Sequence, residues 1–190
     1  TLRRGLSCSG GDGCRRDEED RETETVLDNS LAESSFNDAG NIADQAAEGS
    51  VDSYKSGGIL SHCAAVTHDT VGNTITIDFG TVNCLCHDGR NRRGQVLVSY
   101  TGAYRDSGSV HSITFSNYFV NDNQVTGTKT VTNMGTNGQG NLWYTVTVNG
   151  SVVRANGAGT VSLTSNRTRT WIAGSGTLAW SDDVYEIGGT

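Results

Sequence analysis

The strongest constraint in this sequence is a two-residue alternation of apolar and polar residues that runs through most of the chain after Thr74. The clearest runs span residues 74–79, 95–100, 125–132 and 144–153. Successive side chains of a β-strand point to opposite faces of a sheet, so this period predicts strands with one apolar and one polar face. The polar members are mainly Thr, Ser and Asn, so the pattern predicts architecture and says little about chemistry.

Eight strands follow from this alternation, joined by short connections. Their expected ranges are 60–68, 73–80, 94–105, 109–121, 123–133, 142–154, 159–172 and 177–187. Sequential strands with short links usually pair as antiparallel neighbours. We therefore expect a mainly β protein, either an antiparallel β-sandwich or a twisted open roll, with one N-terminal helix and an extended N-terminal arm. The β domain is expected to cover residues 51–190.

The turns between these strands depend on residues that tolerate a positive φ, because the chain has 25 glycines and no proline. Asn121-Asp122-Asn123 lies between two strand patterns and is expected as a turn. Asn149-Gly150 lies inside one alternating run, so it is either a hairpin turn or a β-bulge.

One segment, residues 28–50, is expected to be helical, with the helix itself at 28–48. Its narrow apolar stripe follows three- and four-residue steps and consists of Leu27, Leu31, Ser35, Ala39, Ile42 and Ala46. Three residues can cap its start, namely Asp28, Asn29 and Ser30. Gly49 can end it. The stripe is expected to pack against the sheet.

Residues 1–27 are expected to form a low-complexity arm, because they are rich in Gly and charged residues and contain few apolar ones. Such a segment becomes ordered only when something holds it, and a neighbouring subunit is the expected partner. Four residues at its end can extend as a strand along a neighbour's sheet edge, namely Thr23, Thr25, Val26 and Leu27.

The composition excludes some partners. A net charge of −7 disfavours nucleic acid and anionic membranes. No apolar stretch approaches the roughly 20 residues that a membrane-spanning helix needs. The expected partners are therefore identical subunits, with no nucleic acid and no membrane span.

Cysteine usage points to an oxidising compartment, since the Ser/Thr/Asn-rich β composition is typical of secreted proteins, in which disulfides persist. Cys63 is expected to pair with Cys84 or Cys86, and the sequence does not choose between them. A metal site built from these cysteines with His62 or His87 is the less favoured alternative, because the C-x-C-H spacing lacks the usual zinc or haem patterns. We expect no metal and no other cofactor.

Groups of catalytic residue types are not evident. The four histidines have no paired spacing, and nothing resembles a nucleophile elbow. Aromatic residues in the strands can form a sugar-stacking platform, but strand aromatics are more often core or cross-strand pairs. The expected protein is not an enzyme.

Six segments carry a resemblance, namely Phe36 to Asp38, Asn41 to Ala46, Thr74 to Gly80, Gly89 to Gly94, Tyr118 to Asn123 and Thr170 to Gly174. They resemble a family of uncharacterised secreted or surface lipoproteins from Bacteroidota, over most of the chain from about Cys14 onward. The resemblance implies an extracellular or outer-surface location, and it implies no activity. It makes Cys14 a candidate lipid-bearing residue, although Gly11-Asp12-Gly13 before it departs from a lipobox. Asp69-Thr70-Val71 resembles the O-glycosylation motif of that phylum, which makes Thr70 a candidate glycan site.

Together these observations predict a non-enzymatic extracellular structural protein that associates with copies of itself, as a surface assembly or filament, through its N-terminal arm. The first alternative is a monomeric surface lipoprotein that binds a glycan or protein ligand. The second alternative, less favoured, is an enzyme that acts on polysaccharide.

Overall fold

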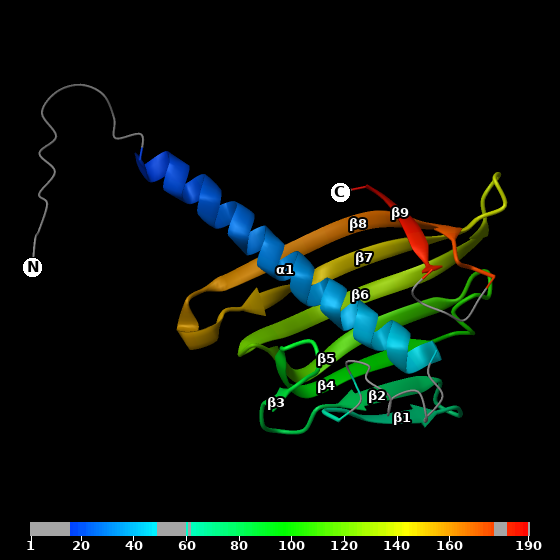
Figure 1. Cartoon of the computed structure of the whole chain (residues 1–190), viewed down its shortest axis with the longest axis horizontal. Helices are drawn as coiled ribbons and strands as arrows, with labels where there is room; N and C mark the ends of the chain where they lie inside the picture. Colours follow the sequence, from blue (N-terminus) through cyan, green and yellow to red (C-terminus); the bar gives the residue numbers. More distant parts are fainter. Residues whose placement is uncertain (1–15, 49–59, 61, 177–181, 190) are drawn as a thin grey trace, which may run out of the picture.

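The computed structural model describes residues 16–48, 60, 62–176 and 182–189. Figure 1 shows one long helix lying diagonally across one face of a single open sheet. The helix is α1 (Arg16–Glu48), and the strands are β1 (Ala65–Asp69), β2 (Thr74–Asp78), β3 (Cys84–Leu85), β4 (Asn91–Tyr100), β5 (Val110–Val120), β6 (Asn123–Thr136), β7 (Leu142–Val153), β8 (Thr160–Ala173) and β9 (Val184–Gly189). The expected mainly β fold is confirmed as an open sheet. The sandwich alternative is wrong, because all nine described strands belong to one sheet.

The strands form an antiparallel meander in the order β1-β2-β4-β5-β6-β7-β8-β9, with the short β3 paired to β4. Two-residue connections are possible because Asn and Asp accept a positive φ. Asn121 and Asp122 join β5 to β6 with φ values of 49° and 64°, which confirms the expected turn. The helical part of the described chain contains no stretch with the length and apolar character of a membrane-spanning helix.

The hydrophobic core lies between α1 and the sheet, as the apolar stripe predicts, except that Leu27 of that stripe is exposed. α1 contributes Phe36 and Ile42, which are fully buried, and the sheet contributes alternate residues of its central strands. The sheet residues include Ile75, Ile77, Val96, Val98, Ile113, Val125, Val148 and Val152. Burial of these side chains removes apolar area from water and fixes which face of the sheet the helix covers.

Asn149-Gly150 is neither a turn nor a bulge, so both expectations for it are wrong. Gly150 lies inside β7 directly opposite Gly127 of β6, with no shift of register between them. A Cβ atom on Gly150 would collide with the ring of Phe36. The glycine therefore gives the Phe36 ring its place against the sheet.

The opposite face of the sheet carries rows of hydroxyl and amide side chains. One row crosses from β4 to β8 in register, through Ser99, Ser112, Thr130, Thr147 and Asn166. These residues occupy the polar positions of the alternation, so the two-faced sheet that the sequence predicts is confirmed.

The helix begins at Arg16, not at residue 28. Glu and Arg are good helix formers, and acidic residues near a helix N-terminus interact favourably with the helix dipole, so the charge run continues the helix. Residues 23–27, predicted as a strand-forming end of the arm, are therefore helical. Figure 1 shows this part of α1 projecting beyond the sheet.

Three predicted strands have clearly different bounds. The first begins at Ala65, not at residue 60, because the chain turns at residues 62–63. The strand predicted at 94–105 is β4, which begins at Asn91 and ends at Tyr100. The last is β9 at Val184–Gly189. Residues 177–181 of its predicted range lie outside the described residues.

Candidate functional site

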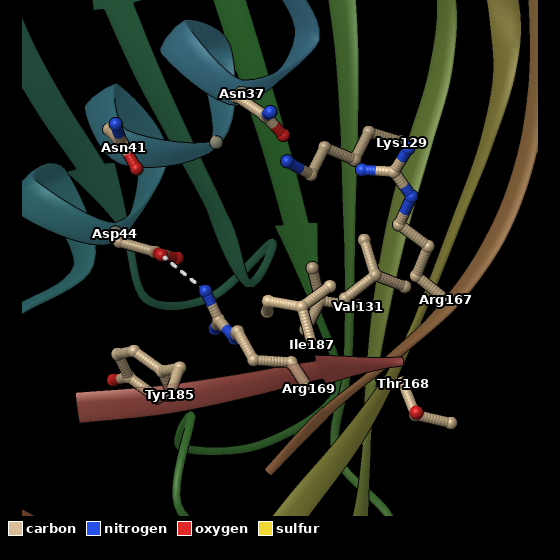
Figure 2. A pocket seen from close by; sticks show the side chains of 12 residues that line it. Asn37, Asn41, Asp44, Lys129, Val131, Arg167, Thr168, Arg169, Tyr185 and Ile187 are labelled. Carbon is tan, nitrogen blue, oxygen red and sulfur yellow. Dashed lines mark hydrogen bonds and ion pairs between the residues drawn. The ribbon is translucent and has the colours of Figure 1, made fainter. Parts of the chain in front are cut away.

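A pocket opens between α1 and the C-terminal half of the sheet. Its volume is about 270 Å³, and its lining residues are Asn37, Gly40, Asn41, Asp44, Lys129, Val131, Val146, Arg167, Thr168, Arg169, Tyr185 and Ile187. Figure 2 shows the Lys129 side chain reaching toward Asn37, and Arg169 reaching toward Asp44 on α1. Three cationic side chains and one carboxylate therefore line the same small space.

These cations lie on the helix-covered face because of strand alternation. Lys129 lies on the same side of β6 as Val125 and Val131, both of which are buried. Arg167 and Arg169 share a side of β8 with the buried Trp171. The basic residues thus replace apolar ones at core-facing positions.

Lys129 is the least expected member, because it is only 7 % exposed. Its Nζ donates to the backbone oxygen of Phe36 at 3.1 Å. An ammonium has three donors, so two remain for other acceptors. Burial lowers the pKa of Lys129, while the carboxylate of Asp44 opposes this effect and Arg167 adds to it. Among the residues that the structure describes, this cation therefore lacks its full set of acceptors.

Gly40 explains how the ammonium reaches the helix backbone. A Cβ atom at this position would lie 2.5 Å from Lys129 Nζ, closer than side-chain contacts allow. Glycine costs helix stability in the middle of α1. In return it leaves the space that the ammonium occupies.

Arg167 and Arg169 form the other side of the pocket. Arg167 pairs with Glu33 of α1. Arg169 Nη1 lies 3.5 Å from Asp44 Oδ2, which is a long contact. Its Nε is buried and has no hydrogen-bond partner within the described part of the chain. A buried donor without an acceptor is costly, and it often marks a place where a water or a ligand binds.

A group of aromatic side chains continues from the pocket toward the end of the sheet. The Arg169 guanidinium lies 4.7 Å from the ring centre of Tyr185. Tyr185 is packed against Trp171, with ring centres 5.4 Å apart. Burial raises the pKa of Tyr185. The buried Trp171 Nε1 also has no acceptor among the described residues. This group is mostly core, as expected for strand aromatics, although Tyr185 also lines the pocket.

A second buried cation, Arg92, lies on β4 beneath the same helix. Its Nη2 donates to Asp38 at 2.6 Å and to Asp88 at 2.5 Å. Tyr118 Oη also lies 3.4 Å from Asp38. Hydrogen bonds to Arg92 lower the pKa of Asp88. Both carboxylates are thus held by Arg92, and this cluster fixes α1 on the sheet.

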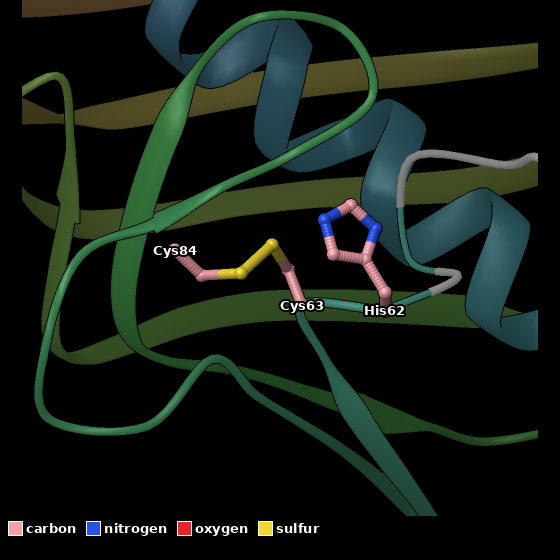
Figure 3. Close-up of side chains that lie close together, drawn as sticks. All are labelled: His62, Cys63 and Cys84. Carbon is pink, nitrogen blue, oxygen red and sulfur yellow. A yellow bond between two sulfur atoms is a disulfide. The ribbon is translucent and has the colours of Figure 1, made fainter.

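The cysteine prediction is confirmed, with Cys84 as the partner. Cys63 and Cys84 form a disulfide, with Cα atoms 5.6 Å apart, and Cys86 is free and buried. β3 ends at Leu85, and Cys86 begins a turn in which its N–H donates to the Arg90 oxygen. Cys84 lies on β3 and Cys86 lies beyond its end, so these two residues do not share one face of a strand. Figure 3 shows the His62 ring beside the disulfide.

The other predicted site residues are spread over the molecule. Thr70 is exposed in the turn between β1 and β2, where Asp69 Oδ1 accepts from the N–H groups of Val71 and Gly72. Thr25, Val26 and Leu27 are exposed on α1, and the backbone of Thr23 is helical. Cys14 lies outside the described residues. None of these described residues lines the pocket.

The sequence analysis missed Lys129, Arg167 and Arg169. A signal existed, because each stands at an apolar position of its alternating run. A charged residue at such a position requires either a partner or a function, since an unpaired buried charge is costly.

Comparison of the chain with protein-family models, with curated proteins and with solved structures found no match in any of the three.

Proposed function

We propose that this protein is an extracellular, non-enzymatic binding protein of the cell surface, whose pocket beneath α1 binds an acidic sugar unit of a glycan. The observation that carries this proposal is the buried Lys129 ammonium, which shares the pocket with Arg167 and Arg169 and, among the described residues, donates to the backbone oxygen of Phe36. A carboxylate would supply the acceptors that these cations lack. Charge-assisted hydrogen bonds of this kind are stronger than neutral ones.

The rest of the pocket matches a sugar of this class. The amides of Asn37 and Asn41 lie at the helix side and can bond hydroxyl groups. Tyr185 and Ile187 offer apolar surface for the face of a sugar ring. The volume of about 270 Å³ is below the roughly 300–1,000 Å³ of pockets for drug-sized ligands. A ligand of monosaccharide size fits these limits.

The experiment is isothermal titration calorimetry with galacturonate and glucuronate, compared with galactose and glucose. The acidic sugars should bind, and the neutral ones should not. Acetate tests whether any carboxylate suffices. Lys129→Met should weaken binding by about tenfold or more, since a hydrogen bond to a charged group contributes ~1.5–3 kcal/mol.

Arg93→Met is the matched control, because Arg93 pairs with Asp122 outside the pocket and should leave binding unchanged. Equal binding of neutral and acidic sugars would reject the proposal. So would full binding by the Lys129→Met variant.

The cell-surface part of the proposal is supported by the disulfide and by the Thr- and Ser-rich face of the sheet. A lipid on Cys14 and a glycan on Thr70 stay predictions. Intact-mass spectrometry of the native exported protein checks both, because each adds a defined mass.

Self-association is a second candidate function, favoured by exposed apolar residues. Val26 and Leu27 are 67 % and 62 % exposed on the projecting part of α1. The strand-addition route is no longer supported, because these residues are helical, so a contact between helices of two subunits replaces it. Sedimentation velocity of the full chain and of a Val26→Ser, Leu27→Ser variant tests this. A monomeric full-length chain at high concentration would reject self-association.

A further inference from the structure

Sulfur and imidazole side chains gather at the edge of the sheet around the disulfide. The potential ligand atoms of His62, Cys63 and Cys84 all lie within 4.8 Å of one another. The ring centres of His62 and His87 are 4.5 Å apart. Figure 3 shows the His62 ring next to the two bridged sulfur atoms. This cluster lies apart from the pocket beneath α1, and the proposed function does not use it.

The bridged and the reduced forms of this cluster have different chemistry. A metal ion binds thiolates, not the sulfurs of a disulfide. Reduction of the bridge would leave two thiols beside the His62 imidazole, with the ring centre of His87 4.5 Å from that of His62. Together these four residues are the Cys₂His₂ donor set of tetrahedral zinc sites. We propose that the dithiol form of this protein binds one Zn²⁺ through Cys63, Cys84, His62 and His87, so that the disulfide and the zinc exclude each other.

The positions of the four residues allow this change with little movement of the sheet. His62 and Cys63 lie in the turn before β1, Cys84 lies on the two-residue β3, and His87 lies in the turn that follows it. Tetrahedral zinc with Zn–S bonds of ~2.3 Å places its two sulfurs ~3.8 Å apart. The two sulfurs need to move apart only to that distance, and the His87 ring needs to turn from the His62 ring toward them. These short edge segments can adjust without breaking the central strands.

The reaction balances in two steps. A dithiol reductant transfers two electrons and two protons to the bridge, which breaks the sulfur–sulfur bond and leaves an oxidised dithiol. Zn²⁺ then displaces the two thiol protons, so two protons are released for each ion bound. Two thiolates, two neutral imidazoles and Zn²⁺ make a site of zero net charge.

Cys86 is not part of the proposed ligand set. Its thiol is buried, with Sγ 3.7 Å from the backbone oxygen of Cys84. Cys86 therefore provides a matched control.

The zinc would cross-link the same two segments that the disulfide joins. Both links connect residues 63 and 84, which are 21 positions apart. A metal that binds the folded chain stabilises it by mass action. The reduced chain is therefore expected to recover a higher melting temperature when zinc is added.

The experiment uses the full chain, reduced with a phosphine and then freed of reductant without exposure to air. Zinc stoichiometry should be one per reduced chain and zero per oxidised chain. Co²⁺ as a spectroscopic probe should give the visible bands of tetrahedral coordination and a thiolate charge-transfer band. Cys63→Ser should abolish these bands, His87→Asn should weaken Co²⁺ binding by about tenfold or more, and Cys86→Ser should leave both unchanged.

Circular dichroism of the reduced chain keeps the test decisive. Zinc bound by a chain that has lost its strand signal would overturn the proposal, because unfolded thiols also bind metal. Equal binding by the oxidised chain would overturn it, as would loss of the cobalt bands in the Cys86→Ser variant. Failure here would leave the acidic-sugar proposal intact, since the two sites share no residue.

Discussion

Two basic side chains are buried beneath the same helix, and their surroundings differ in kind. Arg92 is fully buried and donates to the carboxylates of Asp38 and Asp88. Lys129 is almost as buried, but it donates to one backbone oxygen at 3.1 Å. The pKa of Arg92 is raised by its carboxylate partners against the effect of burial, whereas burial lowers the pKa of Lys129.

The comparison separates a structural ion pair from a binding group. A buried charge with complete hydrogen bonds serves to fix one arrangement of the chain, and its loss leaves another charge unpaired. A buried charge with incomplete hydrogen bonds lowers the stability of the unliganded fold. Such a residue is retained when a ligand supplies the missing acceptors, which is the role proposed for Lys129.

The largest expected effect is the loss of the Arg92 cluster. Arg92→Met should lower the free energy of unfolding by about 3–5 kcal/mol, because Asp38 would lose its main partner inside the core. Urea unfolding measures this. Arg93→Met removes the neighbouring, more exposed pair with Asp122 and should cost about 0–1 kcal/mol. Equal losses in the two variants would show that burial of the Arg92 cluster does not matter.

Replacement of Lys129 is expected to change the free energy of unfolding in the opposite direction. Lys129→Met should raise the free energy of unfolding by about 1–2 kcal/mol near neutral pH, because no charge then needs to be buried. A lysine whose pKa is lowered by folding destabilises the fold below its folded pKa. This penalty fades as the pH rises from the folded pKa toward 10.5, the ordinary pKa of a lysine in the unfolded chain. The gain measured by chemical denaturation should therefore shrink at alkaline pH. A destabilised variant would mean that Lys129 is already well paired.

A smaller effect is expected at Gly40, where a new Cβ atom would meet the ammonium. Gly40→Ala in the wild-type background should gain less than the roughly 1 kcal/mol that alanine offers in a helix. In the Lys129→Met background more of that gain should return. A double-mutant cycle by thermal unfolding should give a coupling of about 1 kcal/mol. Simple additivity would show that the two residues do not compete for space.

The smallest expected effect concerns acid sensitivity at the pocket end of the sheet. Burial lowers the pKa of His111, whose Nε2 lies 3.2 Å from the backbone oxygen of Gly102. The unfolded chain then binds the proton first, so stability falls as pH drops from 6.5 through the folded pKa. His111→Phe should flatten the dependence of unfolding free energy on pH in that window. The same substitution at the exposed His68 controls for the loss of an imidazole.

Much of the sheet could be predicted from the sequence, because strand alternation is a local property. The turn at Asn121-Asp122 and the segment 28–48 of α1 followed for the same reason. The helix start was missed, since a run of charged residues carries no apolar periodicity although it extends a helix well. Phe36 over Gly150 was also missed, because a local pattern cannot show which side chain of a distant element needs the space.

The sequence by itself determined the two faces of the sheet, the positions of most strands and the three cysteines from which one disulfide forms. Only the tertiary structure decided that the sheet stays open, that Cys84 is the partner of Cys63, and that Lys129 meets the backbone of Phe36, 93 residues away. The physical reason is that strand and helix periods arise from neighbouring residues. The choice between a paired and an incompletely paired buried cation depends on where α1 lies on the sheet.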